Sequence, residues 1–213
     1  VYYDRPGRIV FLMRSDITEE YQEQLRQKER LKDALKNARV DSLTGLYNRQ
    51  AICREISRFL ESPACSRAVL LFMDLDDFKN INDTRGHRSG DYALRCVADL
   101  FRHTLRATDM VGRVGGDEFV ALLTGISAEK GGVECAKRLC EAVSSMEDPN
   151  MGGLKLSCSI GGAVCPKDGN DYDTLFVKAD TAAYEAKRQG KNRYVFYTPG
   201  LELKNGYCSS SMS

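Results

Sequence analysis

From residue 41 onward, hydrophobic and polar positions alternate along the chain with two different periods. Apolar residues spaced by three or four positions predict amphipathic helices, and short continuous apolar runs predict buried strands. On this basis we expect helices at residues 48–61, 78–84, 91–105, 128–146 and 173–189. We expect strands at residues 68–73, 110–114, 119–123, 154–164 and 194–197.

The strands predicted at residues 110–114 and 119–123 are joined by Gly115-Gly116-Asp117-Glu118. Two apolar runs joined by a glycine-rich turn are typical of an antiparallel hairpin. Because helices alternate with strands along most of the remaining chain, the pattern predicts an α+β domain with helices packed on a mixed sheet.

The N-terminal part of the chain has a different pattern. A strand is predicted at residues 7–14, and a strongly charged stretch follows at residues 19–39. Its heptad alignment places Tyr21, Lys28 and Leu35 at one seam position; Ile17, Gln24, Leu31 and Ala38 take the other. Two polar residues in the seam allow a weak coiled coil, and a solvated linker helix explains the pattern equally well.

The strand, Asp16-Ile17-Thr18 and the charged helix together resemble the end of a PAS sensor domain that leads into a signalling helix. We therefore expect a sensor remnant at residues 1–16, a linker helix or coiled coil at 17–40, the main domain at 41–198 and a flexible tail at 199–213. The chain starts at Val1 without a signal-peptide pattern, so we expect a piece of a longer protein.

Composition excludes several classes of protein. The chain has 213 residues, a formal net charge of +1, 42% hydrophobic and 29% charged residues, which is typical of a globular domain. The near-neutral charge argues against nucleic-acid binding, and no apolar run reaches the ~20 residues that span a membrane. Eight cysteines without a C-x-x-C pair, and two histidines, offer no zinc site. Reduced core thiols fit best, so we expect a cytoplasmic fragment and leave membrane attachment of the full-length protein open.

Carboxylates gather at two places in the predicted domain. Asp74, Asp76 and Asp77 follow the apolar run at 68–73, and the hairpin turn holds Asp117 and Glu118. If the hairpin lies beside that strand, these side chains meet at one edge of the sheet. Such a cluster suits a hard divalent cation such as Mg²⁺. The alternative is a solvated turn, because Gly-Gly-Asp-Glu is good turn chemistry by itself.

Lys79, Asn82 and Asp91 follow the first acidic group. A lysine at a helix start beside a metal cluster can help to bind phosphate. Asn82 and Asp91 can read a base edge, and an aspartate that accepts two N–H donors fits guanine. The alternatives are a helix-end asparagine and an N-cap aspartate for a helix that starts at Asp91.

The residues 113–119, Arg-Val-Gly-Gly-Asp-Glu-Phe, resemble the signature of the GGDEF family, the diguanylate cyclases. Four further blocks in the family's order resemble its other motifs, at residues 41–49, 72–83, 86–91 and 179–193. The resemblance implies a sheet like that of nucleotidyl cyclases and polymerase palms, mostly antiparallel and flanked by helices. It implies condensation of two GTP into cyclic di-GMP and two pyrophosphates across a homodimer, with two Mg²⁺ or Mn²⁺ ions in each active site.

The resemblance also implies roles for individual residues. Metal binding falls to Asp74, the Leu75 carbonyl, Asp117 and Glu118. The catalytic residues are Asp117, Glu118 and Lys79; Asp117 matches the base for the 3′-hydroxyl, although a metal-bound alkoxide makes a dedicated base less necessary. Substrate contacts fall to Phe78, Asn82, His87, Asp91, Lys187 and Lys191.

Arg106-Ala107-Thr108-Asp109 resembles the family's R-x-x-D inhibitory site for the product. Lys137 or Arg138 on the following helix completes such a site, and the sequence does not choose between them. The alternative for Arg106 and Asp109 is an ion pair at a helix end. The main alternative function is a catalytically silent module that binds GTP or cyclic di-GMP. A cyclase that makes an adenine-containing dinucleotide is a third interpretation, which the presence of Asp91 disfavours.

Overall fold

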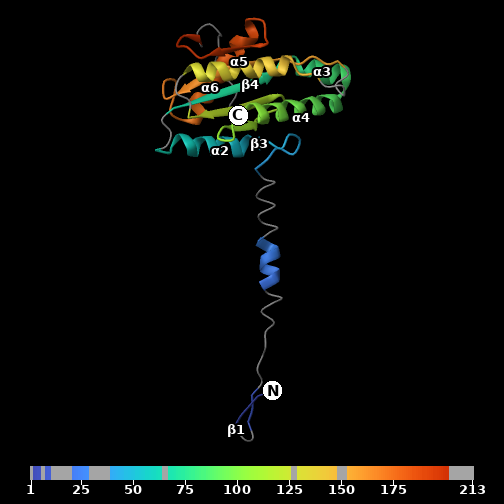
Figure 1. Cartoon of the computed structure of the whole chain (residues 1–213), viewed down its shortest axis with the longest axis vertical. Coiled ribbons are helices and arrows are strands. Elements are labelled where there is room, and N and C mark those ends of the chain that lie inside the picture. The colour runs from blue at the N-terminus through green and yellow to red at the C-terminus, as the bar shows by residue number, and fades with distance from the viewer. Residues whose placement is uncertain are drawn as a thin grey trace, which may run out of the picture. The chain divides into compact units, whose positions relative to one another are not determined.

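The computed structural model describes residues 2–5, 8–10, 21–28, 39–63, 67–125, 129–147 and 153–201. The chain divides into two compact units, Val1–Ala38 and Arg39–Ser213, which can be followed by colour in Figure 1. In the described residues, no helix is both long and apolar enough to cross a membrane.

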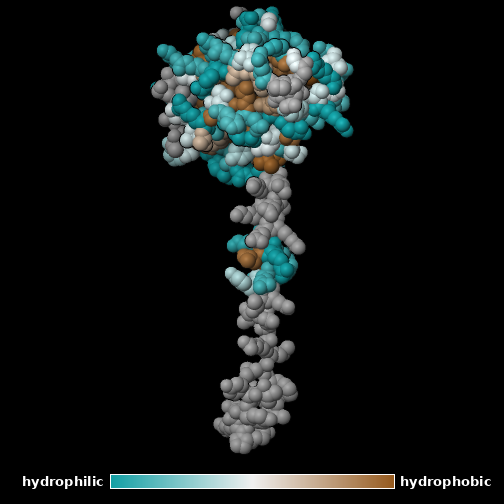
Figure 2. Space-filling model, turned by 45° about the vertical axis from the view of Figure 1, so that its right-hand side comes forward, coloured by the Kyte–Doolittle hydropathy of each residue, from teal (hydrophilic) through white to brown (hydrophobic). Residues whose placement is uncertain are grey.

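The smaller unit contains β1 (Tyr2–Arg5) and β2 (Arg8–Val10), which pair antiparallel, and a helical segment over residues 21–28. The strand predicted at residues 7–14 is thus confirmed over β2, whereas β1 was not predicted. Tyr21 and Leu25 are 65% and 47% exposed, and Figure 2 shows this helical segment to be mostly hydrophilic. Seam positions 17, 31, 35 and 38 lie outside the described residues, so the coiled coil stays a prediction.

The larger unit is built on a six-stranded mixed sheet with the order β3-β5-β6-β4-β7-β8. The strands are β3 (Tyr47–Asn48), β4 (Ala68–Leu75), β5 (Met110–Arg113), β6 (Glu118–Thr124), β7 (Cys158–Cys165) and β8 (Arg193–Phe196). The three central pairings are antiparallel, and β3 and β8 add to the edges in parallel. The predicted α+β class and the hairpin are confirmed; β3 has only two residues and was not predicted.

Helices cover both faces of this sheet (Figure 1). One face packs against α3 (Phe78–Arg85), α4 (His87–Thr104) and α5 (Glu129–Ser144). The other packs against α2 (Arg49–Leu60) and α6 (Tyr172–Arg188). Successive residues of β4 alternate between the two clusters, and every β4 residue is buried, as the continuous apolar run predicted.

Three boundaries differ from the prediction in ways that affect the site. β4 continues to Leu75 because its ladder with β7 extends that far, so Asp74 lies inside the strand. α4 begins at His87, directly after Gly86, which has a φ of 79°. Asp91 therefore lies within the helix, and its interpretation as an N-cap was wrong. β7 begins at Cys158, the partner of Leu75 at the end of β4.

The C-terminal end of the described chain packs on the domain. Leu201 is buried together with Ala182 and Tyr197. The rest of the tail predicted to be flexible lies outside the described residues.

Candidate functional site

Two acidic segments meet at one edge of the sheet, as the sequence predicted. Asp74 in β4 is the register partner of Glu118 in β6. The backbone N–H of Leu75 donates to the carbonyl oxygen of Asp117 at 3.2 Å. The β4 end and the hairpin turn are therefore held side by side by backbone hydrogen bonds.

A cation from α6 reaches this acidic edge. Nζ of Lys187 lies 2.6 Å from Oδ2 of Asp74, which is only 8% exposed. Burial raises the pKa of Asp74 to about 6, and the charges of Asp117 and Glu118 add to this, while Lys187 partly offsets the rise. The pKa of Glu118 is also raised, first by burial. Burial thus disfavours the ionised form of both carboxyls, and their neighbouring acids add to that effect.

Asp180 in α6 is a further carboxylate at this edge, for which the sequence analysis proposed no role. Burial raises its pKa, and the charge of Asp74 raises it further against the effect of Lys187. The signal was present in the sequence: Asp180 and Lys187 are seven residues apart, about two helical turns, and so share one face of α6.

Arg113 holds the hairpin turn in place. Its Nε and Nη2 donate to the carbonyl oxygen of Gly116 at 3.0 and 2.8 Å, and its Nη1 donates to Oδ1 of Asp41 at 3.1 Å. Burial of Asp41 acts to raise its pKa, but hydrogen bonds from Thr44 and Arg113 outweigh this and the pKa is lowered. A Cβ at Gly115 would meet the carboxylate end of the Glu118 side chain, so a larger residue there would have to displace that carboxylate.

The donor set at this edge fits a hard cation in its chemistry. Asp74, Asp117 and Glu118 are oxygen donors, which a hard divalent cation prefers as ligands. Across the described ranges, no three acidic, histidine or cysteine side chains form a ready-made metal cluster. Asp74 is instead paired with Lys187.

The predicted phosphate contacts lie on two adjoining segments. Lys79 is exposed near the start of α3, and Nζ of Lys191 lies 2.6 Å from Oδ1 of the exposed Asp77. Asp77 and Lys191 both have a positive φ, 55° and 61°. Phe78 is only 7% exposed and packs in the hydrophobic core, so it fixes the start of α3 to the core.

The predicted guanine contacts lie at the corner between α3 and α4. A Cβ at Gly90 would collide with the side-chain oxygen of Asn82, so Asn82 lies against the turn of α4 that precedes Asp91. Asp91 and His87 are exposed. The structure thus brings Asn82 and the first turns of α4 together, with Asp91 open to a ligand.

Comparison with known proteins shows the family. A family model described as "Diguanylate cyclase, GGDEF domain" matches residues 38–193. The chain belongs to the GGDEF domain family. The probable diguanylate cyclase DgcC of Escherichia coli is 37% identical over 157 residues, which are 72% of this chain and 42% of that protein. The bifunctional diguanylate cyclase/cyclic di-GMP phosphodiesterase MucR of Pseudomonas aeruginosa is 36% identical over 163 residues, 76% of this chain and 24% of MucR.

A solved structure shares the fold of this GGDEF domain. The coiled coil and GGDEF domain of DgcB from Caulobacter crescentus, in complex with c-di-GMP, superposes with a TM-score of 0.77 at 26% identity. The match covers 84% of this chain and 96% of the DgcB chain. The chain spans less than half the length of DgcC and of MucR, 42% and 24%.

A hollow of about 110 Å³ lies beside Arg106 and Asp109 of the GGDEF domain. It is also lined by Arg138, whereas Lys137 pairs with Glu141 at 3.7 Å. Of these two basic residues, Arg138 therefore lines the hollow with Arg106 and Asp109. Asp109 accepts the backbone N–H groups of Arg106 and Thr124, each at 3.0 Å, so the described contacts of its carboxylate are to backbone and do not form the helix-end ion pair.

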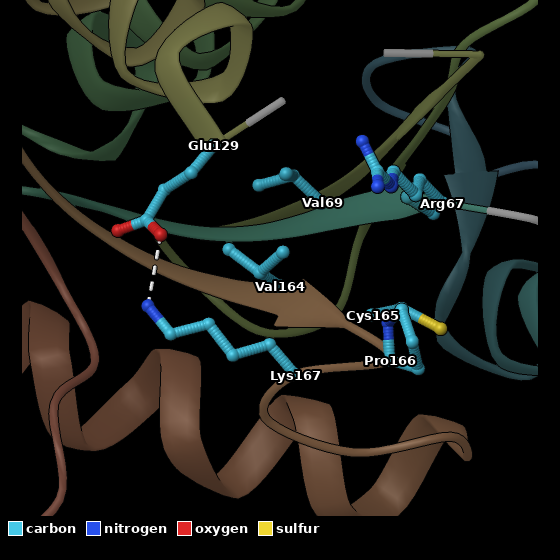
Figure 3. A pocket seen from close by; sticks show the side chains of 8 residues that line it. Arg67, Val69, Glu129, Val164, Cys165, Pro166 and Lys167 are labelled. Carbon is cyan, nitrogen blue, oxygen red and sulfur yellow. Dashed lines mark hydrogen bonds and ion pairs between the residues drawn. The ribbon is translucent and has the colours of Figure 1, made fainter. Parts of the chain in front are cut away.

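A second hollow, of about 380 Å³, lies at the opposite end of β4 from Asp74, between β4, β7 and the start of α5 (Figure 3). Lys167 and Glu129 face each other across it, with Nζ and Oε2 2.8 Å apart. Arg67, the other cation of its lining, also has an interaction partner. The charged groups of this hollow are therefore engaged within the protein, and none of the predicted site residues lines it.

Proposed function

We propose that this chain is a diguanylate cyclase, which condenses two GTP into cyclic di-GMP and two pyrophosphates. The observation that carries the proposal is the pairing of buried Asp74 with half-buried Glu118 across β4 and β6, beside Asp117 in the hairpin turn. Three lysines, Lys79, Lys187 and Lys191, lie on the segments around it. Acidic donors beside cations match the demands of a metal-bound triphosphate.

In this proposal Asp74, Asp117, Glu118 and the Leu75 carbonyl hold two Mg²⁺ or Mn²⁺ ions. The ions, when bound, neutralise the charge that develops on the triphosphate. Lys79, Lys187 and Lys191 contact phosphate oxygens. Asn82 and Asp91 bind the guanine edge, and His87 makes a further contact with the substrate.

Each domain offers one such site, so the reaction needs two domains facing each other. The 3′-hydroxyl of each GTP attacks the α-phosphorus of the other, so that two phosphodiester bonds form and two pyrophosphates leave. Asp117 is the candidate base for that hydroxyl. The homodimer follows from this stoichiometry and is part of the proposal.

The proposal also includes product inhibition at the hollow lined by Arg106, Asp109 and Arg138. Two guanidinium groups beside a carboxylate suit phosphates and the edges of guanine. The c-di-GMP complex of the similar DgcB GGDEF domain supports a product-binding role for the fold.

The competing proposal is a silent module that binds GTP or cyclic di-GMP without turnover. The presence of Asp74, Asp117 and Glu118 together favours an enzyme. The test is incubation of the purified chain with GTP, with ATP or with both, in Mg²⁺, followed by identification of products by mass spectrometry. Cyclic di-GMP from the wild type and none from a folded Asp117→Asn variant is expected. Binding of GTP without any product would establish the silent module instead.

A further inference from the structure

Asp76 is a buried carboxylate that the proposed mechanism does not use. It is 7% exposed. Its Oδ2 accepts the Ser157 hydroxyl at 2.6 Å and the backbone N–H of Asn192 at 3.0 Å, and its Oδ1 accepts the Ser159 hydroxyl at 2.7 Å. Its own backbone N–H donates to the carbonyl oxygen of Ser157 at 2.9 Å. One side chain thus joins three segments that are far apart in the sequence.

The segments joined by Asp76 are those proposed to bind the triphosphate. Asp74 and Lys79 lie on the same short stretch as Asp76, and Lys191 directly precedes Asn192. From this arrangement we propose that Asp76 is a positioning residue that fixes the β4–α3 stretch to the α6–β8 turn, and so sets the spacing of the phosphate-binding groups. The inference rests on the proposed cyclase function and adds a residue to it.

Strained backbone on both sides supports this role. Asp77 has a φ of 55°, and Lys191 and Asn192 have φ values of 61° and 48°. Aspartate and asparagine enter this left-handed region more readily than other non-glycine residues, so the cost is greatest at Lys191, and such conformations persist where surrounding contacts hold them. The hydrogen bond from Asn192 to buried Asp76 is such a contact.

The nearby ion pair is less able to hold the two segments together. Lys191 and Asp77 are 42% and 65% exposed in their side chains, and exposed pairs contribute little stability in salt. Lys191 is also a proposed phosphate contact, and it must release Asp77 to bind a ligand. Asp76 can keep the segments together when that exchange occurs.

The same contacts argue against Asp76 as a metal ligand. Both of its oxygens already accept hydrogen bonds, and Oδ2 accepts two. A buried carboxylate is costly unless donors surround it, and here the three donors come from β7, the loop before it and the α6–β8 turn. Asp76 therefore acts through the residues beside it.

Two substitutions separate this role from a need for negative charge. Asp76→Asn can keep all three contacts, because its oxygen can accept from Ser157 and Asn192 while its amide donates to the Ser159 hydroxyl. Asp76→Ala loses all three. If Asp76 positions the segments, Asp76→Asn stays within threefold of the wild type in KM for GTP, whereas Asp76→Ala raises KM at least tenfold. A metal ligand would lose turnover in both variants.

Asp168→Ala is the matched control. Asp168 is also buried, 6% exposed, and its Oδ2 accepts the backbone N–H of Val164 at 2.7 Å, at the other end of β7. This variant should lower Tm about as much as Asp76→Ala and leave KM for GTP unchanged. An equal rise of KM in both alanine variants would show general destabilisation and overturn the inference.

Amide hydrogen exchange without nucleotide supplies a readout that does not need activity. Exchange at residues 190–193 should become at least tenfold faster in Asp76→Ala than in the wild type or Asp168→Ala. Unchanged exchange, or a wild-type KM in Asp76→Ala, would overturn the inference while the cyclase proposal stands. A wild type that makes no cyclic di-GMP would instead defeat the proposed function.

Discussion

Lys187 in the last turn of α6 lies 2.6 Å from Asp74 at the end of the central strand. Burial nevertheless keeps the pKa of Asp74 raised to about 6, because it outweighs the Lys187 contact, and the charges of Asp117 and Glu118 raise it further. The ionised form of this buried carboxyl therefore costs the fold stability. The proposed metal-binding role needs an ionised carboxylate at Asp74, whereas the stability of the fold favours a neutral side chain there.

The first prediction is that Asp74→Asn stabilises the fold and abolishes turnover. The substitution removes a buried negative charge at pH 7, so Tm in EDTA should rise by ~2–4 °C. The same change removes a proposed metal ligand, so cyclic di-GMP production should be lost. Thermal scans and a GTP turnover assay check both effects. Asp83→Asn, at an exposed position of α3, is the control and should change neither.

The second prediction concerns the pH dependence of that stabilisation. The pKa of Asp74 is raised in the fold from 3.8 to about 6, so the folded state holds the proton more tightly than the unfolded state. The stability that Asp74 contributes is full below pH 3.8 and is lost as the pH rises through about 6. The Tm difference between Asp74→Asn and the wild type should therefore be smallest near pH 4 and grow up to pH 7. A difference that shrinks over this range would contradict the assignment.

The third prediction concerns Arg113. Lysine at this position cannot hold Gly116 and Asp41 at the same time, because it lacks the guanidinium fork. Arg113→Lys should lower turnover about tenfold, since loss of a charged hydrogen bond costs ~1–3 kcal/mol, and should lower Tm by a few degrees. Arg58→Lys is the control: Arg58 is 70% exposed and pairs with Glu55 on its own helix. Wild-type turnover in a folded Arg113→Lys variant would show that the contacts of Arg113 with Gly116 and Asp41 are not needed for turnover.

The fourth prediction concerns base selection. Asp91 is exposed in the first turns of α4, near Asn82 of α3, and is proposed to accept the N–H groups of guanine. Asp91→Ser leaves those donors unpaired at ~1–3 kcal/mol per buried group, so kcat/KM for GTP should fall roughly 5- to 150-fold. The preference for GTP over ATP should narrow as well. Competition assays with both nucleotides measure this preference, and an unchanged ratio would place guanine recognition elsewhere.

The fifth prediction compares two neighbours on α5. Arg138 lines the hollow beside Arg106 and Asp109, whereas Lys137 pairs with Glu141. Arg138→Ala should weaken cyclic di-GMP binding at least tenfold and relieve inhibition, with the initial rate nearly unchanged. Lys137→Ala should leave product affinity at the wild-type value. Calorimetry with cyclic di-GMP measures the affinity of both variants. Equal losses of affinity would show that the product binds this surface only through nonspecific positive charge.

Much of the architecture was predictable because local patterns and tertiary packing agree. The buried apolar run at 68–73 indicates a central strand, and the Gly115-Gly116 turn indicates a hairpin. The sheet contains both. The start of α4 was missed because the turn from His87 to Gly90 has no apolar periodicity; its helical conformation follows from Gly86. Two-residue β3 is defined by its parallel pairing with β5, which no local pattern shows.

The candidate site was predicted where chemistry is concentrated in short motifs, and missed where it depends on distant contacts. Asp76 was one carboxylate among three in the sequence, and its partners Ser157, Ser159 and Asn192 are 81, 83 and 116 residues away. Lys137 and Arg138 were equivalent by position, and only the direction of α5 separates them. In both cases the missing information is which segments the fold brings together.

The length of β6 separates the two proposed sites of this domain. Glu118 begins the strand at the acidic edge, and Thr124 ends it at the hollow beside Asp109. Six steps of ~3.4 Å place these residues about 20 Å apart. A dinucleotide seated at Asp109 is thus too remote to displace a nucleotide at Glu118 of the same chain by direct overlap. Under the proposed function, substitutions at one of these sites can therefore remove feedback or synthesis without contacting the other site.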